Sequence, residues 1–244
     1  MATYLDLRSG PRRDAFEHFG AFDQPFFSLC TRMDVAALQA ALIQAQAQAQ
    51  AQAHPLPLSL THHPGPGGFN LACHHIALCL ANQHEPFRLR LEGSGPQARV
   101  RLHARVDAST TVLRADDSFG FAHLRYQPRF ADFRAHAAAA MQAVRDGPAG
   151  FHEPPPGLQG DDAALMYFTT LPWVHFTSFA HARPGPGVPD SIPRVAFGRI
   201  DSDGARRWLP VALDVHHALM DGVHAGRWLQ ALEAAFAEPQ DWLA

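Results

Sequence analysis

One short segment of the sequence has residue types and spacing that could carry out catalysis. An apolar run typical of a buried strand delivers two adjacent histidines, His216 and His217, and Asp221 and Gly222 follow. Histidine can serve as a general base near neutral pH, because its usual pKa is about 6.5. Asp221 could fix the turn or accept hydrogen bonds where the last helix begins, and Gly222 would permit a chain reversal. A single histidine at a strand end is usually structural, but the doubled histidine at a strand-to-helix junction favours a functional site.

Composition excludes several other chemistries. The chain has 244 residues with 20 Lys+Arg and 23 Asp+Glu, and every basic residue is arginine. Without lysine there is no pyridoxal-phosphate Schiff base, no P-loop lysine and no kinase lysine. The net charge of −3 and the lack of a long arginine cluster argue against nucleic-acid binding. The three cysteines, Cys30, Cys73 and Cys79, form no C-x-x-C pair and predict buried free thiols in a reducing cytoplasm.

Three further signals point away from other protein classes. The histidine and cysteine groups at residues 62–63 and 73–75 lack the spacing of metal ligands, so we expect no metal site. Ser178 is not part of a G-x-S-x-G motif, which argues against a serine hydrolase. The first 16 residues do not resemble a signal peptide, and no apolar run is long enough to cross a bilayer. We therefore predict a cytoplasmic protein with no membrane partner.

The elements that must position the two histidines follow from hydrophobic periodicity. Helices are predicted over residues 12–19, 35–53, 69–82, 133–144 and 223–237. Strands are predicted over residues 27–33, 87–91, 100–106, 110–113, 119–126, 165–170, 174–180, 194–201 and 208–216. The Gln-Ala repeat of residues 44–53 alternates like a strand, but both residues favour helices, so it is interpreted as a helix extension. Residues 54–68 are rich in proline and glycine and predict a loop.

Mixed hairpins and helices, with no linker between separate cores, predict a single α/β domain over residues 1–244. In that domain, the segment from His216 to Arg227 closely resembles the signature of the type A chloramphenicol acetyltransferases. Residues 12–19 with 25–29 resemble the N-terminal segment of that family, and residues 171–179 resemble its central Pro-Trp segment. The H-x-x-x-D-G motif alone is shared with condensation domains, plant-type acyltransferases and dihydrolipoyl acyltransferase cores. The first two are much longer chains, and the last normally follows a lipoyl domain. The resemblance covers most of the chain and is weakest at residues 44–68.

The resemblance implies both a fold and an activity. The fold is a two-layer sandwich, with a mixed, largely antiparallel β-sheet covered by helices as in CoA-dependent acyltransferases. The implied enzyme is a homotrimer with active sites at its subunit interfaces and acetyl-CoA as co-substrate, with no permanently bound cofactor. It would acetylate a small-molecule hydroxyl, most simply that of chloramphenicol, and so confer antibiotic resistance. His217 would be the general base of a direct transfer, and Asp221 with Arg12 a structural pair.

The remaining site residues are also implied by the resemblance. Thr169 stands where the family has a serine hydroxyl that stabilises the oxyanion. Acceptor binding is assigned to Phe19, Phe27, Phe151 and His181, and CoA binding to Arg199 and Trp173, although Trp173 alone would suggest core packing.

The acceptor half departs from the family, because Phe19 replaces a tyrosine, His181 an apolar residue and Ala196 a threonine. Two alternatives stay open: another hydroxylated acceptor, or a non-catalytic trimeric binding protein on the same scaffold.

Overall fold

A long central strand, β10 (Arg206–His216), organises the fold and ends on the first of the two histidines. In the computed structural model, which describes residues 2–51, 68–93, 95–148, 150–151, 160, 164–185 and 190–243, this strand is buried continuously from Leu209 to His216. The reason is its apolar sequence, which is covered on both faces. β10 therefore ends in the core one residue before His217, where the H-x-x-x-D-G motif begins.

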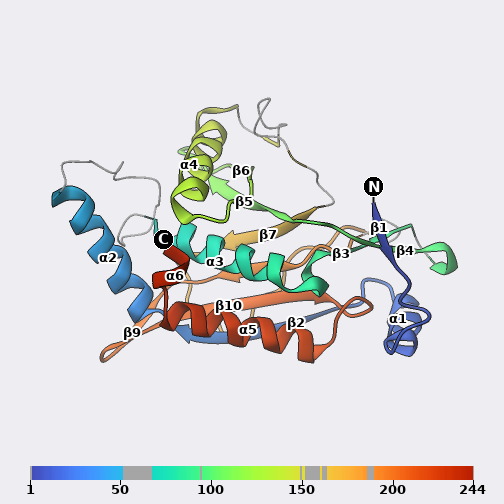
Figure 1. Ribbon diagram of the computed structural model, residues 1–244. Coiled ribbons are helices and arrows are strands. Elements are labelled where there is room, and N and C mark those ends of the chain that lie inside the picture. Colours follow the sequence, from blue (N-terminus) through green and yellow to red (C-terminus); the bar gives the residue numbers. More distant parts are fainter. Residues whose placement is uncertain are drawn as a thin grey trace.

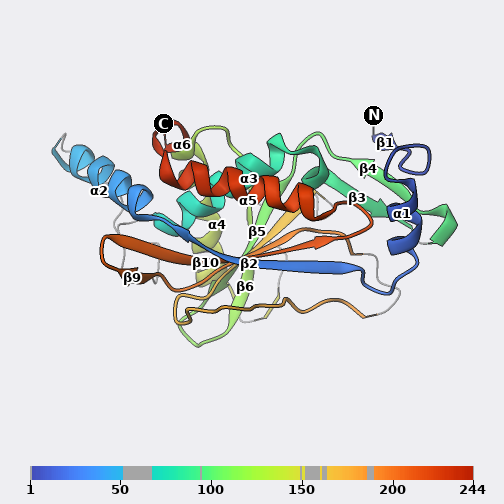
Figure 2. The same ribbon diagram turned by 90° about the horizontal axis from the view of Figure 1, so that it is seen from below.

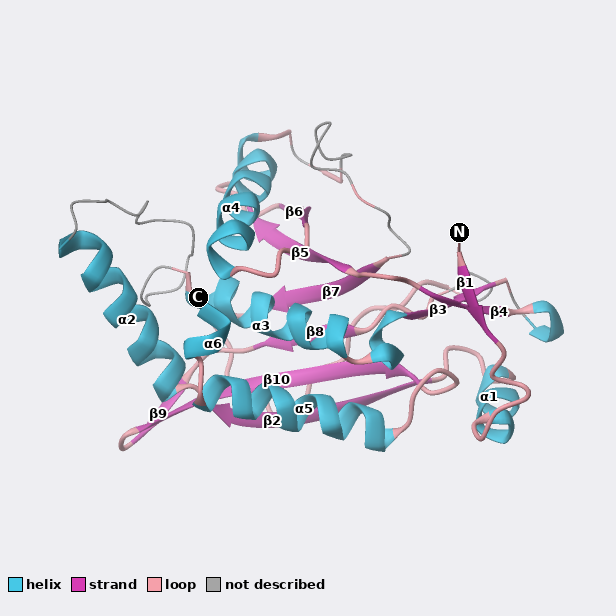
Figure 3. Cartoon of the chain, viewed as in Figure 1, coloured by secondary structure: helices cyan, strands magenta, loops and turns pink. Residues whose placement is uncertain are grey.

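Within the described residues, seven strands form a mixed sheet around β10 (Figures 1 and 3). The order is β2-β10-β8-β7-β5-β6, and β9 pairs with an extension of β10. β5, β7 and β8 run parallel, while β2, β8 and β9 are antiparallel to β10 and β6 is antiparallel to β5. The bounds are β2 (Phe26–Asp34), β5 (Asp107–Leu113), β6 (Phe119–Leu124), β7 (Leu165–Thr170), β8 (Arg194–Phe197) and β9 (Asp201–Asp203).

Helices cover one face of this sheet, as the edge-on view in Figure 2 shows. α3 (Phe69–Gln83) is buried from Leu71 to Ala81, because a helix that is apolar on all sides must lie inside the core. It packs between α5 (Gly222–Ala237) and α4 (Phe130–Asp146). The fold class is therefore confirmed: a mixed sheet with a helical layer.

The remaining elements lie at the ends of this core. A separate three-stranded sheet has the order β1-β4-β3, and α1 precedes β2. α2 includes the Gln-Ala repeat as far as Ala51, while the predicted loop of residues 54–68 lies almost entirely outside the described residues. The bounds are β1 (Thr3–Leu5), α1 (Arg13–Gly20), α2 (Ala36–Ala51), η1 (Glu85–Arg88), β3 (Leu89–Glu92), η2 (Gly95–Gln97), β4 (Arg99–Leu102) and α6 (Gln240–Leu243). Among the residues that the structure describes, every helix is too short or too polar to span a bilayer.

One predicted strand is wrong, because residues 174–180 form no strand. This segment instead runs across the face of the sheet opposite the helices, where Phe176 and Phe179 cover Ala196 and Ala212. Gly198 allows the close approach, since a Cβ there would lie 2.9 Å from the carbonyl oxygen of Val174. An alternating pattern is equally compatible with an extended segment packed flat on a sheet.

Two further expectations need correction. Gly222 does not have a positive φ, and a Cβ there would meet nothing within 4 Å, so it is an ordinary first helical residue. The reversal is made instead by the turn after β10, where the amides of Leu219 and Met220 donate to the carbonyl of His216 at 3.0 and 3.1 Å. Cys73 and Cys79 are buried free thiols as expected, whereas Cys30 is exposed on β2.

Candidate active site

The turn after β10 holds His217 between main-chain and aromatic contacts. Its amide donates to the carbonyl of Pro25 at 2.6 Å. Its ring stacks on Phe19, with centroids 3.6 Å apart and planes 9° from parallel, and lies 4.7 Å from the ring of Phe27. Nδ1 is covered and lies 3.5 Å from Oδ1 of Asp221, while the side chain as a whole keeps 30% of its exposure. The open edge of the ring is thus the one that carries Nε2, from which a general base could act.

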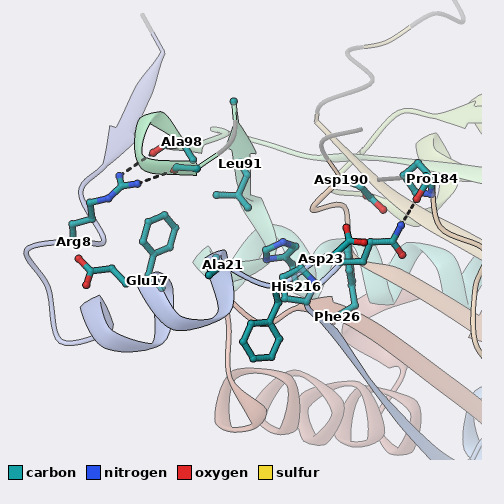
Figure 4. A pocket seen from close by; sticks show the side chains of 18 residues that line it. Arg8, Glu17, Ala21, Asp23, Phe26, Leu91, Ala98, Pro184, Asp190 and His216 are labelled. Carbon is teal, nitrogen blue, oxygen red and sulfur yellow. Dashed lines mark hydrogen bonds between the residues drawn. The ribbon is translucent and has the colours of Figure 1, made fainter. Parts of the chain in front are cut away.

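His216, the last residue of β10, points to a different environment. Only 4% of it is exposed, and burial lowers its pKa to about 4, so it is neutral at pH 7. It lines a cavity of about 500 Å³ between α1, the β3–β4 hairpin and the chain near Asp190 (Figure 4). None of the predicted site residues lines this cavity. Because the imidazole of His216 is buried and neutral, it is a poorer candidate for the general base than the imidazole of His217.

Arg12 ties the turn to the N-terminal segment. It immediately precedes α1, and its Nη2 donates to Oδ1 of Asp221 at 2.8 Å and to the carbonyl of His217 at 3.1 Å. Burial lowers the pKa of Arg12, and attraction to Asp221 opposes that shift. Because Asp221 is already paired with a cation, its carboxylate adds little net charge beside His217. The pair can therefore orient His217, because Arg12 holds its carbonyl and Asp221 lies beside its Nδ1.

Replacing Arg12 with alanine should destabilise the protein by about 1–3 kcal/mol, because Asp221 and the carbonyl of His217 both lose a partly buried donor. Urea unfolding measures the loss. Arg13→Ala is the matched control, since the Arg13 side chain forms an exposed pair with Glu17 and its loss should cost less than about 1 kcal/mol. Equal stability of the two variants would show that the pair with Asp221 has no structural role.

Thr169 lies far from His217 within one chain. It pairs with Ala196 on β8, which pairs with Ala212 on β10, five residues before His217. Two strand spacings and five residues of rise place the two groups on the order of 20 Å apart. The structure therefore does not bring the predicted base and the predicted oxyanion donor together in one protomer.

An exposed aromatic cluster lies near Thr169, on the face of the sheet opposite the helices. Phe119, Phe121 and Phe151 are 43%, 48% and 66% exposed, and Phe121 stacks on Phe151 at 5.0 Å. Thr111 pairs with Phe121, and continuing the β5–β7 register places Thr111 beside Thr169. The sequence prediction included Phe151 but missed the other two, although their two-residue spacing placed them on one strand face.

The remaining predicted residues lie in two different places. Trp173 is 59% exposed, and its neighbour Val174 accepts the amide of Arg199 at 2.8 Å, so the two predicted CoA contacts share one end of the sheet. His181 lies elsewhere: its Nδ1 is 3.1 Å from Oδ2 of the fully buried Asp214, and its Nε2 is covered. Among the described residues, no group of three His, Cys, Asp or Glu side chains could hold a metal ion.

Known proteins resemble this chain over most of its length. The family model described as chloramphenicol acetyltransferase matches residues 68–233. A chloramphenicol acetyltransferase of Streptomyces acrimycini is 28% identical over 98% of this chain and 96% of that protein. Chloramphenicol acetyltransferase 2 of Haemophilus influenzae is 26% identical over 95% of each.

Solved structures resemble the fold as well. A chloramphenicol acetyltransferase structure has a TM-score of 0.69 at 20% identity and covers 97% of this chain and 100% of its own. The dihydrolipoamide acetyltransferase of Azotobacter vinelandii has a TM-score of 0.66 at 18% identity and covers 95% of this chain and 88% of its own. At these identities the likeness shows the fold alone.

Proposed function

Because the chain belongs to the chloramphenicol acetyltransferase family, we propose that this acetyltransferase moves an acetyl group from acetyl-CoA to a hydroxyl of chloramphenicol. The observation that carries the proposal is the setting of His217, whose ring is fixed by Phe19 and the turn while its Nε2 edge stays open. Such an imidazole is placed to take a proton from a bound alcohol. We also propose that the protein works in the cytoplasm.

The transfer needs only a base, positioning and an oxyanion donor. His217 removes the acceptor proton as the acceptor oxygen attacks the thioester carbonyl. The hydroxyl of Thr169 donates to the oxyanion that develops on the carbonyl oxygen. The C–S bond then breaks, and the thiolate of CoA takes the proton from His217. Arg199 and Trp173 would contact CoA, and with no lysine in the chain every cationic phosphate contact must come from arginine or histidine.

We further propose that each active site combines two copies of the chain in a homotrimer. The separation of Thr169 from His217 supports this, because a single protomer cannot supply both groups to one carbonyl. Each group also lies near exposed aromatic side chains: Phe22, 52% exposed, lies against Phe19, and the cluster of Phe119, Phe121 and Phe151 lies near Thr169. Exposed apolar patches of this kind favour association between copies.

A different hydroxylated acceptor is the second candidate. The position of His181 favours it, because a polar ring held by Asp214 stands where the family has an apolar residue. Phe19 also carries no hydroxyl. Phe19, Phe27 and Phe151 keep the aromatic surface that an acceptor ring would need.

Purified protein with acetyl-CoA and chloramphenicol should release free thiol at a rate that depends on the acceptor. Chloramphenicol already acetylated on its reactive hydroxyl is the matched control and should give no release. Turnover of another alcohol, but not of chloramphenicol, would select the second acceptor class. A folded oligomer that turns over no hydroxylated compound would contradict the proposal and leave a non-catalytic binding protein.

A further inference from the structure

His224 completes a hydrogen-bonded cap at the start of α5. The amide of Asp221 donates to Nδ1 of His224 at 3.0 Å, and the amide of His224 donates to the carbonyl of Asp221 at 2.9 Å. In a capping box the third helical residue reaches back to the amide of the cap residue, and that role usually falls to glutamate or glutamine. Because an amide can only donate, Nδ1 must be the unprotonated nitrogen, and the ring proton is on Nε2.

The charges around His224 explain why a neutral side chain suits this position. Its Nδ1 is 3.9 Å from Oδ2 of Asp221, whose other oxygen is bound by Arg12. Burial, and then Arg12, lower the pKa of His224; Asp221 opposes this shift and Arg227 adds to it. A glutamate here would place a second carboxylate beside Asp221 and compete with it for Arg12. A neutral acceptor fixes the main chain without disturbing that pair.

A chain of contacts links this cap to the proposed base. His224 holds the amide of Asp221, Asp221 holds Arg12, and Arg12 donates to the carbonyl of His217 at 3.1 Å. Nδ1 of His217 itself lies 3.5 Å from Asp221. A shift of the cap would therefore move His217 through two contacts, the one that Arg12 makes with its carbonyl and the one between Asp221 and its Nδ1.

We propose that His224 is a positioning residue for His217, and that it acts as a neutral hydrogen-bond acceptor for the Asp221 main chain. The inference rests on the proposed function only in taking His217 as the base. It predicts a graded response to three substitutions. His224→Gln keeps a neutral acceptor, His224→Phe keeps the size and loses the acceptor, and His224→Glu keeps an acceptor and adds a charge.

Turnover should follow this order. With acetyl-CoA and chloramphenicol, or the alcohol that the acceptor panel selects, His224→Gln should keep kcat within about twofold, and His224→Phe should lose about 10- to 100-fold in kcat with a smaller change in KM. His224→Glu should fall well below His224→Gln. Equal kcat for the Phe variant and the wild type, or equal losses for Phe and Gln, would overturn the acceptor role. A Glu variant as active as the Gln variant would overturn the requirement for neutrality.

The pH profile separates positioning from simple packing. Protonation of His224 removes its acceptor, so the acid limb of log kcat should be steeper in the wild type than in His224→Gln. The wild type and His224→Gln share the other charged and titratable groups that face this region, which are Arg12, Asp221, Arg227 and His217. Identical limbs would contradict the proposal.

Hydrogen exchange gives a readout that needs no turnover. Amides of residues 221–225 should exchange faster in His224→Phe than in the wild type, and His224→Gln should match the wild type. Unchanged exchange in the Phe variant would overturn the inference even in a fully active enzyme. If the Phe variant exchanged faster but the wild-type protein acetylated no compound, the proposed function would be refuted, and the role of His224 in the cap would still stand.

Discussion

Replacing His217 with alanine should lower kcat for acetyl transfer by about 10²- to 10⁴-fold, because the acceptor alcohol loses the only base that the proposed mechanism supplies. The variant should fold normally. The His217 side chain is 30% exposed, and the hydrogen bond from its main-chain amide to the carbonyl of Pro25 does not involve the side chain. Loss of stacking on Phe19 should cost stability without unfolding the turn. Thiol release at saturating acetyl-CoA and acceptor measures the effect.

His216→Asn is the matched control. His216 is buried, and its lowered pKa of about 4 keeps it neutral, so it should affect stability more than turnover. A His217→Ala protein with normal melting and wild-type turnover would contradict the assignment of the base. A large loss of turnover confined to the His216 variant would move that role to His216.

Thr169→Val should lower kcat by about 10²- to 10³-fold, the usual cost of removing one oxyanion donor. Valine matches the shape of threonine and lacks only its hydroxyl, so packing against Ala196 and the β7–β8 register should survive. Thr169→Ser is the control and should stay near the wild-type rate. Equal rates for valine and serine would exclude the hydroxyl from the reaction.

Mixing the two inactive chains tests the shared site directly. If His217 and Thr169 in one site come from different protomers, trimers assembled from equal amounts of His217→Ala and Thr169→Val chains should recover about one quarter of the wild-type sites. Each separately assembled variant should stay inactive. Mixed trimers that recover nothing would mean that both residues of a site belong to the same chain.

Local sequence patterns predicted most of the elements correctly, and the physical reason is periodicity. The apolar run of residues 69–82 predicted α3, and the apolar stripe of residues 223–237 predicted α5. Both predicted helices begin and end within one residue of the observed bounds. Helix propensity correctly outweighed the two-residue alternation of the Gln-Ala repeat. The same reasoning failed for residues 174–180, since an extended segment crossing a sheet alternates like a strand within it. β1 was too short to give a periodic signal.

The residue types and their spacing predicted which groups could do chemistry: the doubled histidine, the aspartate after it, and a set of cations that contains only arginine. The hydroxyl at residue 169 was predicted from the resemblance to the acetyltransferase family. The three-dimensional fold sets which of those groups lie close together. It placed the ring of His217 on Phe19, turned His216 to the opposite side, and brought Arg12 to within 2.8 Å of Asp221 across the chain. It also put Thr169 on the order of 20 Å from His217, because strand register adds a fixed rise per residue. Spacing along the chain specifies local structure, whereas distances across a sheet depend on the order of strands, which no short motif contains.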